Sequence, residues 1–181
     1  MRRDLKAWIG ILALVGVVAP FSNFANASDT ENNLLIKQAE NPAATHKVAF
    51  VVSKAKMLES YENKTHLTDV ELKDLLYLVG FRGNDLVVAW AIAKKESNGR
   101  PFAFNGNHKT GDSSYGMFQI NMIDNLGPDR RDKFDLDSNA ELFNPVKNAE
   151  IAYYMSRGGE DWSSWKGITP KTRMWMNKFP K

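Results

Sequence analysis

A glutamate at the end of an apolar segment is the side chain in this chain best placed for acid catalysis. Glu96 follows the apolar run 86–93, and the segment Tyr115–Asn121 begins nineteen positions later. A carboxyl at the end of a buried helix faces a low dielectric, which raises its pKa and lets it deliver a proton near neutral pH. Cleavage of a sugar–sugar bond needs such an acid. The alternative is a solvated helix-end residue beside Lys94 and Lys95.

A second carboxyl group lies between Glu96 and the Tyr115–Asn121 segment. Asp112 stands three residues before Tyr115. A second carboxylate in a glycosidase acts as nucleophile, as electrostatic stabiliser or as the base for water. Asp112 either reaches the site in this way or is a turn residue that bonds its own backbone.

The elements that must position Glu96 begin with a helix after residue 67. Thr68 and Glu71 are spaced as a capping box, and Leu67 and Leu72 are placed for the hydrophobic staple around it. Apolar residues then recur at helical spacing until Gly80, which predicts the end of this helix.

A second helix is predicted from Asp85 to about Glu96, with Asn84 as its N-cap. It is nearly all apolar up to Lys94, which indicates the central buried helix of the domain. The segment 102–120 breaks the helical pattern and contains the turn dipeptide 105–106, so a small antiparallel β hairpin is expected beside that helix.

The second half of the chain predicts further helices. Residues 126–131 predict a turn that leads into a short helix, and Ser138 with Glu141 predicts a capping box over one turn. Asn144 followed by Pro145 predicts the start of a helix that runs to about Arg157. The expected fold is therefore mainly α, of the α+β type.

The N-terminal part differs from the rest in composition. Residues 1–27 combine a basic start, an apolar run over 7–19 and a small-x-small site at 25–27, the pattern of a secretory signal peptide. The apolar run is shorter than the roughly 20 residues of a membrane span. We expect cleavage and export to the periplasm or the cell exterior, with an uncleaved membrane anchor as the alternative. Residues 28–66 are expected to form a polar lead, with a short helix or strand over 47–61.

Composition argues against several classes of function. The chain has 24 Lys and Arg against 21 Asp and Glu, and without residues 1–27 the counts become 21 and 20. The near balance of charge gives little reason to expect nucleic acid as a partner. The absence of cysteine excludes thiol catalysis and cysteine-based zinc sites. His46, His66 and His108 are scattered, so neither a metal nor another cofactor is expected.

Between Leu67 and Trp165 the chain resembles the lysozyme superfamily, including the lytic transglycosylases that cut peptidoglycan. The segment 96–98 (Glu-Ser-Asn) and the segment 115–121 carry the resemblance. The latter is similar to the Gly-hydrophobic-hydrophobic-Gln-Ile-Asn strand of chicken-type lysozymes and to the Gly-Leu-Met-Gln motif of lytic transglycosylases. Later segments look like the lysozyme-type domains of phage tail proteins. The resemblance implies a catalytic domain over 67–168, an active-site cleft and Glu96 as the acid.

The chain departs from the chicken-type pattern at one position. Those lysozymes have an aspartate immediately before the Tyr-Gly strand, where this chain has Ser114. Serine cannot replace the carboxylate without activation, and no nearby histidine suggests a triad. Either Asp112 reaches the site, or Glu96 works alone, as implied for lytic transglycosylases. In those enzymes the 6-hydroxyl of the sugar attacks and an anhydro ring forms.

The resemblance also suggests residues that could bind the glycan. Gln119 and Asn121 carry amides that either bond substrate groups or hold the hairpin to the helix. Tyr115 either lines the cleft or packs under the hairpin. One tyrosine of the last long helix, Tyr153 or Tyr154, is expected to approach Glu96. Ser114 completes the set of candidate substrate-binding residues.

The predicted function is that of a monomeric muramidase. It would cleave the β-1,4 bond between N-acetylmuramic acid and N-acetylglucosamine in peptidoglycan glycan strands, by hydrolysis or by transglycosylation. The alternative is a catalytically inactive glycan-binding or assembly module with the same fold. Residues 169–181 form a basic and aromatic tail that either touches an anionic wall or membrane surface or is solvated.

Overall fold

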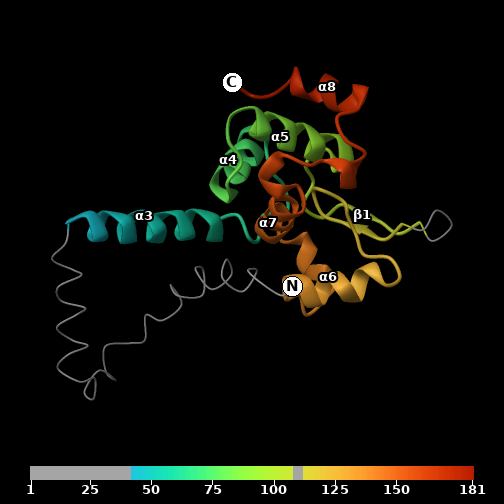
Figure 1. Cartoon of the computed structure of the whole chain (residues 1–181), viewed down its shortest axis with the longest axis horizontal. Helices are drawn as coiled ribbons and strands as arrows, with labels where there is room; N and C mark the ends of the chain where they lie inside the picture. The colour runs from blue at the N-terminus through green and yellow to red at the C-terminus, as the bar shows by residue number, and fades with distance from the viewer. Residues whose placement is uncertain (1–41, 108–111) are drawn as a thin grey trace, which may run out of the picture. The chain divides into compact units, whose positions relative to one another are not determined.

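The computed structural model describes residues 42–107 and 112–181 (Figure 1). The predicted signal peptide 1–27 and the start of the polar lead lie outside the described residues. The chain divides into two units, of which the first ends at Met57 and the second is Leu58–Lys181. Helix α3 spans Pro42–Glu59, so the segment 47–61, expected as a helix or a strand, is largely helical. Among the described helices, none has the length and apolar character to cross a membrane.

Helix α4, Asp69–Val79, begins and ends where the sequence predicts. The Thr68 hydroxyl accepts a 3.2 Å hydrogen bond from the Glu71 backbone N–H, and the Glu71 carboxylate accepts the Thr68 backbone N–H at 2.8 Å. These two bonds form the capping box and satisfy two N–H groups that a helix start leaves free. Gly80 ends the helix with a φ of 144°, a conformation that strains other residues.

Helix α5, Gly83–Ser97, starts two residues before the predicted Asp85. Arg82 is the N-cap, it makes no side-chain cap bond, and Asn84 lies inside the helix, so the prediction of Asn84 as N-cap is wrong. The connection between α4 and α5 explains the difference. Phe81 is fully buried and Gly83 adopts a positive φ of 50°, so the chain enters the helix before it reaches Asn84.

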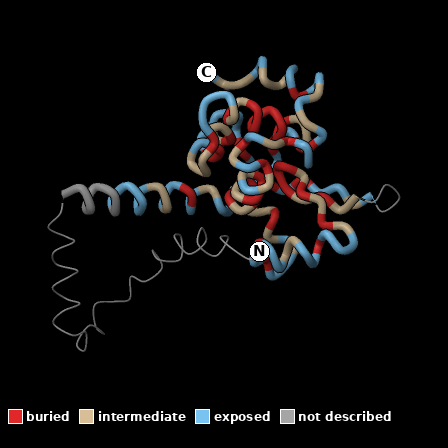
Figure 2. The backbone as a smooth tube through the Cα atoms, viewed as in Figure 1, coloured by how far each residue is buried: buried red, intermediate tan, exposed pale blue. Residues whose placement is uncertain are grey.

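Helix α5 is the central buried helix, as predicted. It packs against α4 and against α8, Pro170–Met176, while α4 also packs against α7, Pro145–Met155. Figure 2 shows that many residues along α5 and α7 are buried. The buried residues of α5 lie on all sides of the helix: Leu86, Val88, Ala89, Trp90, Ala91, Ile92, Ala93, Lys94 and Ser97. The hydrophobic effect on this surface fixes the position of the helix, and with it the position of Glu96.

A small antiparallel sheet follows α5. Its strands are β1, Phe104–Asn105, β2, Ser114–Tyr115, and β3, Ile120–Asn121, in the order β1-β2-β3. Tyr115 pairs with Phe104 on one side and with Ile120 on the other. The resemblance to the chicken-type lysozyme strand implies one strand over 115–121, but the chain turns back on itself over 116–119, and Gln119 lies in that turn with a φ of 48°. Gln119 is therefore not a strand residue, which corrects the prediction.

The second half of the chain contains short helices around α7. They are α6 at Leu126–Phe134, η3 at Asn139–Phe143, η4 at Arg157–Gly159 and η5 at Ser163–Trp165. The capping box of Ser138 and Glu141 and the Asn144 cap of α7 are as predicted. Helix α7 ends at Met155, two residues early, because the chain tightens into η4. The mainly α fold with a small antiparallel sheet is confirmed.

Residues 169–181 contain the docked helix α8. The Trp90 ring on α5 lies 6.1 Å from the Trp175 ring and 5.7 Å from the Phe179 ring, both edge-on. Large aromatic side chains contribute much of the apolar area that a core buries. This segment is thus packed on the central helix and is more than a solvated tail.

Candidate active site

Glu96 lies one residue before the end of α5. Its side chain is 26% exposed, and its Oε1 atom lies 2.8 Å from the Nζ atom of Lys95. The surroundings of the Glu96 carboxylate are therefore not as purely apolar as expected from the sequence, because the group has a cationic neighbour and is partly open to solvent. This exposure leaves a side on which a ligand oxygen can approach.

The Lys95 ammonium links Glu96 to the far part of the chain. Its Nζ atom donates a 2.7 Å hydrogen bond to the carbonyl of Trp165 in η5. The Trp165 indole N–H in turn donates a 2.7 Å bond to the carbonyl of Phe118, in the turn between β2 and β3. Helix α5, η5 and the β2–β3 turn are thus tied together next to Glu96.

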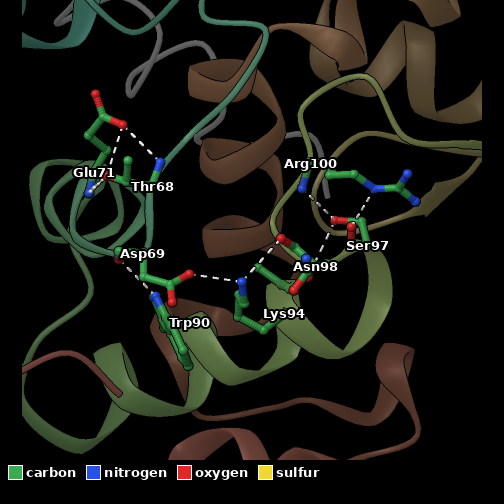
Figure 3. Close-up of polar contacts among 9 residues, drawn as sticks. Thr68, Asp69, Glu71, Trp90, Lys94, Ser97, Asn98 and Arg100 are labelled. Carbon is green, nitrogen blue, oxygen red and sulfur yellow. Dashed lines mark hydrogen bonds and ion pairs between the residues drawn. The ribbon is translucent and has the colours of Figure 1, made fainter. Parts of the chain in front are cut away.

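Ser97 fixes the end of α5 to the same turn. Its buried hydroxyl donates a 2.7 Å hydrogen bond to the Met117 carbonyl and accepts the Arg100 backbone N–H at 3.1 Å. The Arg100 side chain returns a 2.9 Å bond to the Ser97 carbonyl, as Figure 3 shows. Asn98 ends the helix in the left-handed conformation, with a φ of 61°. The role of Ser97 was missed from the sequence, although its place beside the candidate acid was a usable signal.

The last turns of α5 are also anchored to the start of α4 (Figure 3). The buried Lys94 ammonium lies 2.8 Å from the Asp69 carboxylate, and the Trp90 indole donates a 3.0 Å bond to the Asp69 carbonyl. Only the ammonium of this pair is buried, and without the half-exposed Asp69 carboxylate it would lose its anionic partner, so the pair favours one arrangement of α4 and α5. Glu96 therefore projects from a helix end that is held on several sides.

Asn148 on α7 binds the β2–β3 turn through its side-chain amide. Its fully buried amide accepts the Phe118 backbone N–H at 2.9 Å and donates to the carbonyls of Tyr115 and Leu142, both at 3.0 Å. A Cβ on Gly116 would lie only 2.2 Å from the Asn148 amide nitrogen, which explains the glycine at this position. A polar residue within the apolar pattern of α7 was the sequence signal for this contact.

Asp112, just before β2, accepts hydrogen bonds from residues of the sheet. One carboxylate oxygen accepts the Ser114 hydroxyl, and the other accepts the Asn105 side-chain amide at 2.6 Å. Ser114 itself is buried. Asp112 and Ser114 therefore have hydrogen-bond partners at β1 and β2. These bonds fit a turn-stabilising role of Asp112 better than the role of a nucleophile. A part of either residue in the active site stays a prediction.

The amides of Gln119 and Asn121 make hydrogen bonds within the sheet region. Gln119 donates from Nε2 to the carbonyls of Ala103 and Gly116, at 3.2 and 2.9 Å. The Asn121 side-chain oxygen accepts two backbone N–H groups, at 3.2 and 3.1 Å. Of the two roles considered for these amides, these contacts support holding the hairpin.

The tyrosines occupy different regions. Tyr115 packs between other aromatic rings next to the sheet. Tyr153 packs edge-on against the buried Phe81, which precedes α5, with ring centroids 4.9 Å apart. The exposed Tyr154 packs on Phe134 of α6. These contacts give Tyr153 and Tyr154 packing roles, and the approach of either one to Glu96 stays a prediction.

Within residues 42–107 and 112–181, no group of three or more His, Cys, Asp or Glu side chains is arranged to hold a metal ion.

Burial lowers the pKa of Arg130, whose guanidinium donates to the Asn121 carbonyl at the end of β3. The carboxylate of Glu96 and the amide and hydroxyl groups around the sheet are thus the chemistry that the described part of the site offers.

A comparison with known protein families gives a match. A protein-family profile described as a lysozyme-like domain matches residues 73–167, which is more than half of the 181 residues. The matched segment includes the second half of α4, all of α5 with Glu96, the small sheet and α7. Searches of curated proteins and of solved structures returned no match. The resemblance inferred from residues 96–98 and 115–121 is confirmed: the chain belongs to the family of lysozyme-like domains, a peptidoglycan-lytic family.

Proposed function

We propose that this protein is a muramidase that cleaves the β-1,4 bond between N-acetylmuramic acid and N-acetylglucosamine. One observation carries the proposal. Glu96 presents a partly exposed carboxylate at the end of the central helix of a lysozyme-like domain, where Ser97 fixes the helix end to the β2–β3 turn. A glycosidase needs a carboxyl group held in one position beside the glycosidic oxygen.

In the proposed reaction Glu96 acts first as acid and then as base. Its proton passes to the oxygen that leaves C1 of N-acetylmuramic acid, and the sugar passes through an oxocarbenium-like state. The Glu96 carboxylate then accepts a proton from the attacking hydroxyl group.

The attacking group distinguishes two versions of the reaction. In hydrolysis, water forms the new bond to C1 and gives its proton to Glu96. In transglycosylation, the 6-hydroxyl of the same N-acetylmuramic acid forms the bond and an anhydro ring results. Both oxygens of Asp112 accept hydrogen bonds, from Asn105 and Ser114, which gives this carboxylate a structural role beside β2. This favours the transglycosylase version.

Replacement of the acid tests the proposal. Glu96→Gln keeps the size of the side chain but removes the transferable proton, so clearing of a peptidoglycan suspension should fall at least about a hundredfold. Glu160→Gln, at an exposed position in the same domain, is the matched control and should clear the suspension as fast as the parent. Equal rates for Glu96→Gln and the parent would sink the assignment.

The released fragments test the version of the reaction. Mass spectrometry should find anhydro ends, which are lighter than reducing ends by one water. Reducing ends alone would replace transglycosylation by hydrolysis without affecting the role of Glu96.

A second candidate function is a glycan-binding module without catalysis. The serine at position 114 and the occupied carboxylate of Asp112 favour it. Retention of the parent protein on insoluble cell wall, without any loss of turbidity, would support this function over the first.

Export through residues 1–27 also stays a prediction, which N-terminal sequencing of secreted protein would check.

A further inference from the structure

Four aromatic rings form a continuous row on the surface next to the sheet, here called the aromatic row. Phe102 and Phe143 stack almost parallel with centroids 5.4 Å apart, and Phe143 lies 5.4 Å from Tyr115. Tyr115 lies 4.9 Å from Phe104. Phe102 is 57% exposed and Phe104 is 56% exposed. Exposed aromatic rings in contact with one another, rather than scattered singly, mark a surface that binds something.

The aromatic row is built on fixed backbone. Ala103, between the two exposed phenylalanines, accepts the Gly116 N–H at 2.8 Å and the Gln119 amide at 3.2 Å. The Phe104 ring lies where a Cβ of Gly106 would be, 2.6 Å from the nearest ring atom. The rings are therefore held in place before any ligand arrives, which reduces the entropy that binding would cost.

The aromatic row starts on the loop that follows the proposed acid in the chain. Phe102 follows Glu96 by six residues. The loop between them is tied back to the end of α5, because the Arg100 N–H donates to the Ser97 hydroxyl at 3.1 Å and the Ala103 N–H donates to the Arg100 carbonyl at 3.3 Å. The row thus begins on a loop fixed to the end of α5, and its other rings lie on β1, β2 and η3.

Charge narrows the choice of ligand. Within the described residues, no lysine or arginine is in cation–π contact with any of the four rings, whereas other aromatic residues such as Tyr77, Trp90 and Tyr154 have such a partner. An anionic lipid surface or a nucleic acid would need lysine or arginine beside the rings. An uncharged sugar ring would not, and the C–H groups on its face suit the negatively polarised face of an aromatic ring.

We propose that the aromatic row is a glycan-binding subsite that stacks pyranose rings of the N-acetylated strand beside the bond to be cut. This inference rests on the proposed function, because it takes its ligand from the substrate of Glu96. The row would hold the strand in register while the acid acts on a neighbouring linkage. Its contribution is therefore to binding and not to proton transfer.

The test measures binding without turnover. In the Glu96→Gln background, titration with peptide-free strands of alternating N-acetylglucosamine and N-acetylmuramic acid is followed by calorimetry. Phe102→Ala and Phe104→Ala should each weaken binding about five- to tenfold, the loss of one stacked ring. Tyr77→Ala, on α4, is the control, because Tyr77 is also an aromatic residue about half exposed, and binding should not change.

The outcomes separate this proposal from the function on which it rests. Unchanged affinity in both phenylalanine variants overturns the subsite, even if Glu96→Gln abolishes cleavage. Weakened affinity supports it, even if the parent protein proves unable to cleave. Sedimentation of the parent and the two variants tests whether the aromatic row instead binds a second copy of this chain. If the parent self-associates, the variants do not, and glycan affinity is unchanged, the row is a contact between copies and the proposal is overturned.

Discussion

The Nζ atom of Lys95 lies 2.8 Å from the Oε1 atom of Glu96 and 2.7 Å from the carbonyl oxygen of Trp165. Neighbouring residues of a helix do not normally face each other, since their side chains diverge around the axis. The contact exists here because Trp165 in η5 fixes the ammonium beside the helix end. The position of the carboxylate therefore depends on a segment almost seventy residues away in the chain.

Removal of this ammonium should slow the reaction more than it weakens binding. Lys95→Met keeps the length and apolar stem of the side chain but releases Glu96, and misplacement of a catalytic group acts mainly on the rate of the chemical step. We expect kcat on peptidoglycan to fall about tenfold with little change in KM, and Lys95→Arg to recover most of the rate. Steady-state kinetics on soluble strands provides the measurement. Equal kcat for Lys95→Met and the parent would show that Glu96 needs no such support.

Loss of the Asn148 amide should destabilise the domain. Asn148→Leu leaves the Phe118 N–H and two buried carbonyls without their partner, at a cost of about 3 kcal/mol in the free energy of unfolding. Urea unfolding measures the loss, and Asn125→Ala, an exposed residue without a cap bond, is the control, with a change within about 0.5 kcal/mol. Gly116→Ala should act in the same direction, because its Cβ would overlap the Asn148 amide. Stability equal to the parent would mean that the β2–β3 turn does not depend on α7.

The parts of the fold that follow from local sequence were predictable. The capping box of Thr68 and Glu71 needs only four consecutive residues, and so does the Asn144 cap with Pro145 behind it. Asn84 has the same local preference as Asn144 but does not cap a helix. The burial of Phe81 decides where α5 starts, and burial is a tertiary property that a sequence window does not contain.

The candidate site divides in the same way. The position of Glu96 at a helix end follows from the apolar pattern before it. Its partners do not: Lys95 reaches Trp165, and Asn148 reaches the β2–β3 turn, only after distant segments pack together. The contacts of Tyr153 and Tyr154 also depend on tertiary packing. They share a helix with Asn148, but the direction of α7 carries them to Phe81 and Phe134.

The capping box should make stability depend on acid pH. The Lys64 ammonium, then the Thr68 N–H and hydroxyl, lower the pKa of Glu71 to about 2. An unfolded glutamate titrates near 4.3, so the folded state binds its proton less readily than the unfolded state does. The contribution of Glu71 is therefore complete above about pH 4.3 and is lost as the pH falls from there toward 2.

Substitution isolates this contribution. The difference in free energy of unfolding between the parent and Glu71→Gln should be largest near pH 7 and should shrink as the pH approaches 2. Urea titrations at several pH values give the difference directly, and Glu62→Gln, at an exposed position outside the helices, shows the background dependence. A difference that stays constant between pH 7 and pH 2 would contradict the role of the ionised Glu71.

The last helix should stabilise the fold through one ring. Trp175 packs edge-on against the fully buried Trp90 at 6.1 Å, and the Lys94 ammonium lies 5.0 Å from the Trp175 ring centre. Trp175→Ala removes both contacts and uncovers Trp90, so the free energy of unfolding should fall by about 2 kcal/mol, less than the cost at a fully buried position. Met174→Ala, at an exposed position of the same helix, should change it by no more than about 0.5 kcal/mol. The contrary outcome is unchanged stability of Trp175→Ala together with loss of binding to anionic vesicles when Lys171 and Lys178 are replaced. It would mean that residues 170–178 bind an anionic surface instead of stabilising the core.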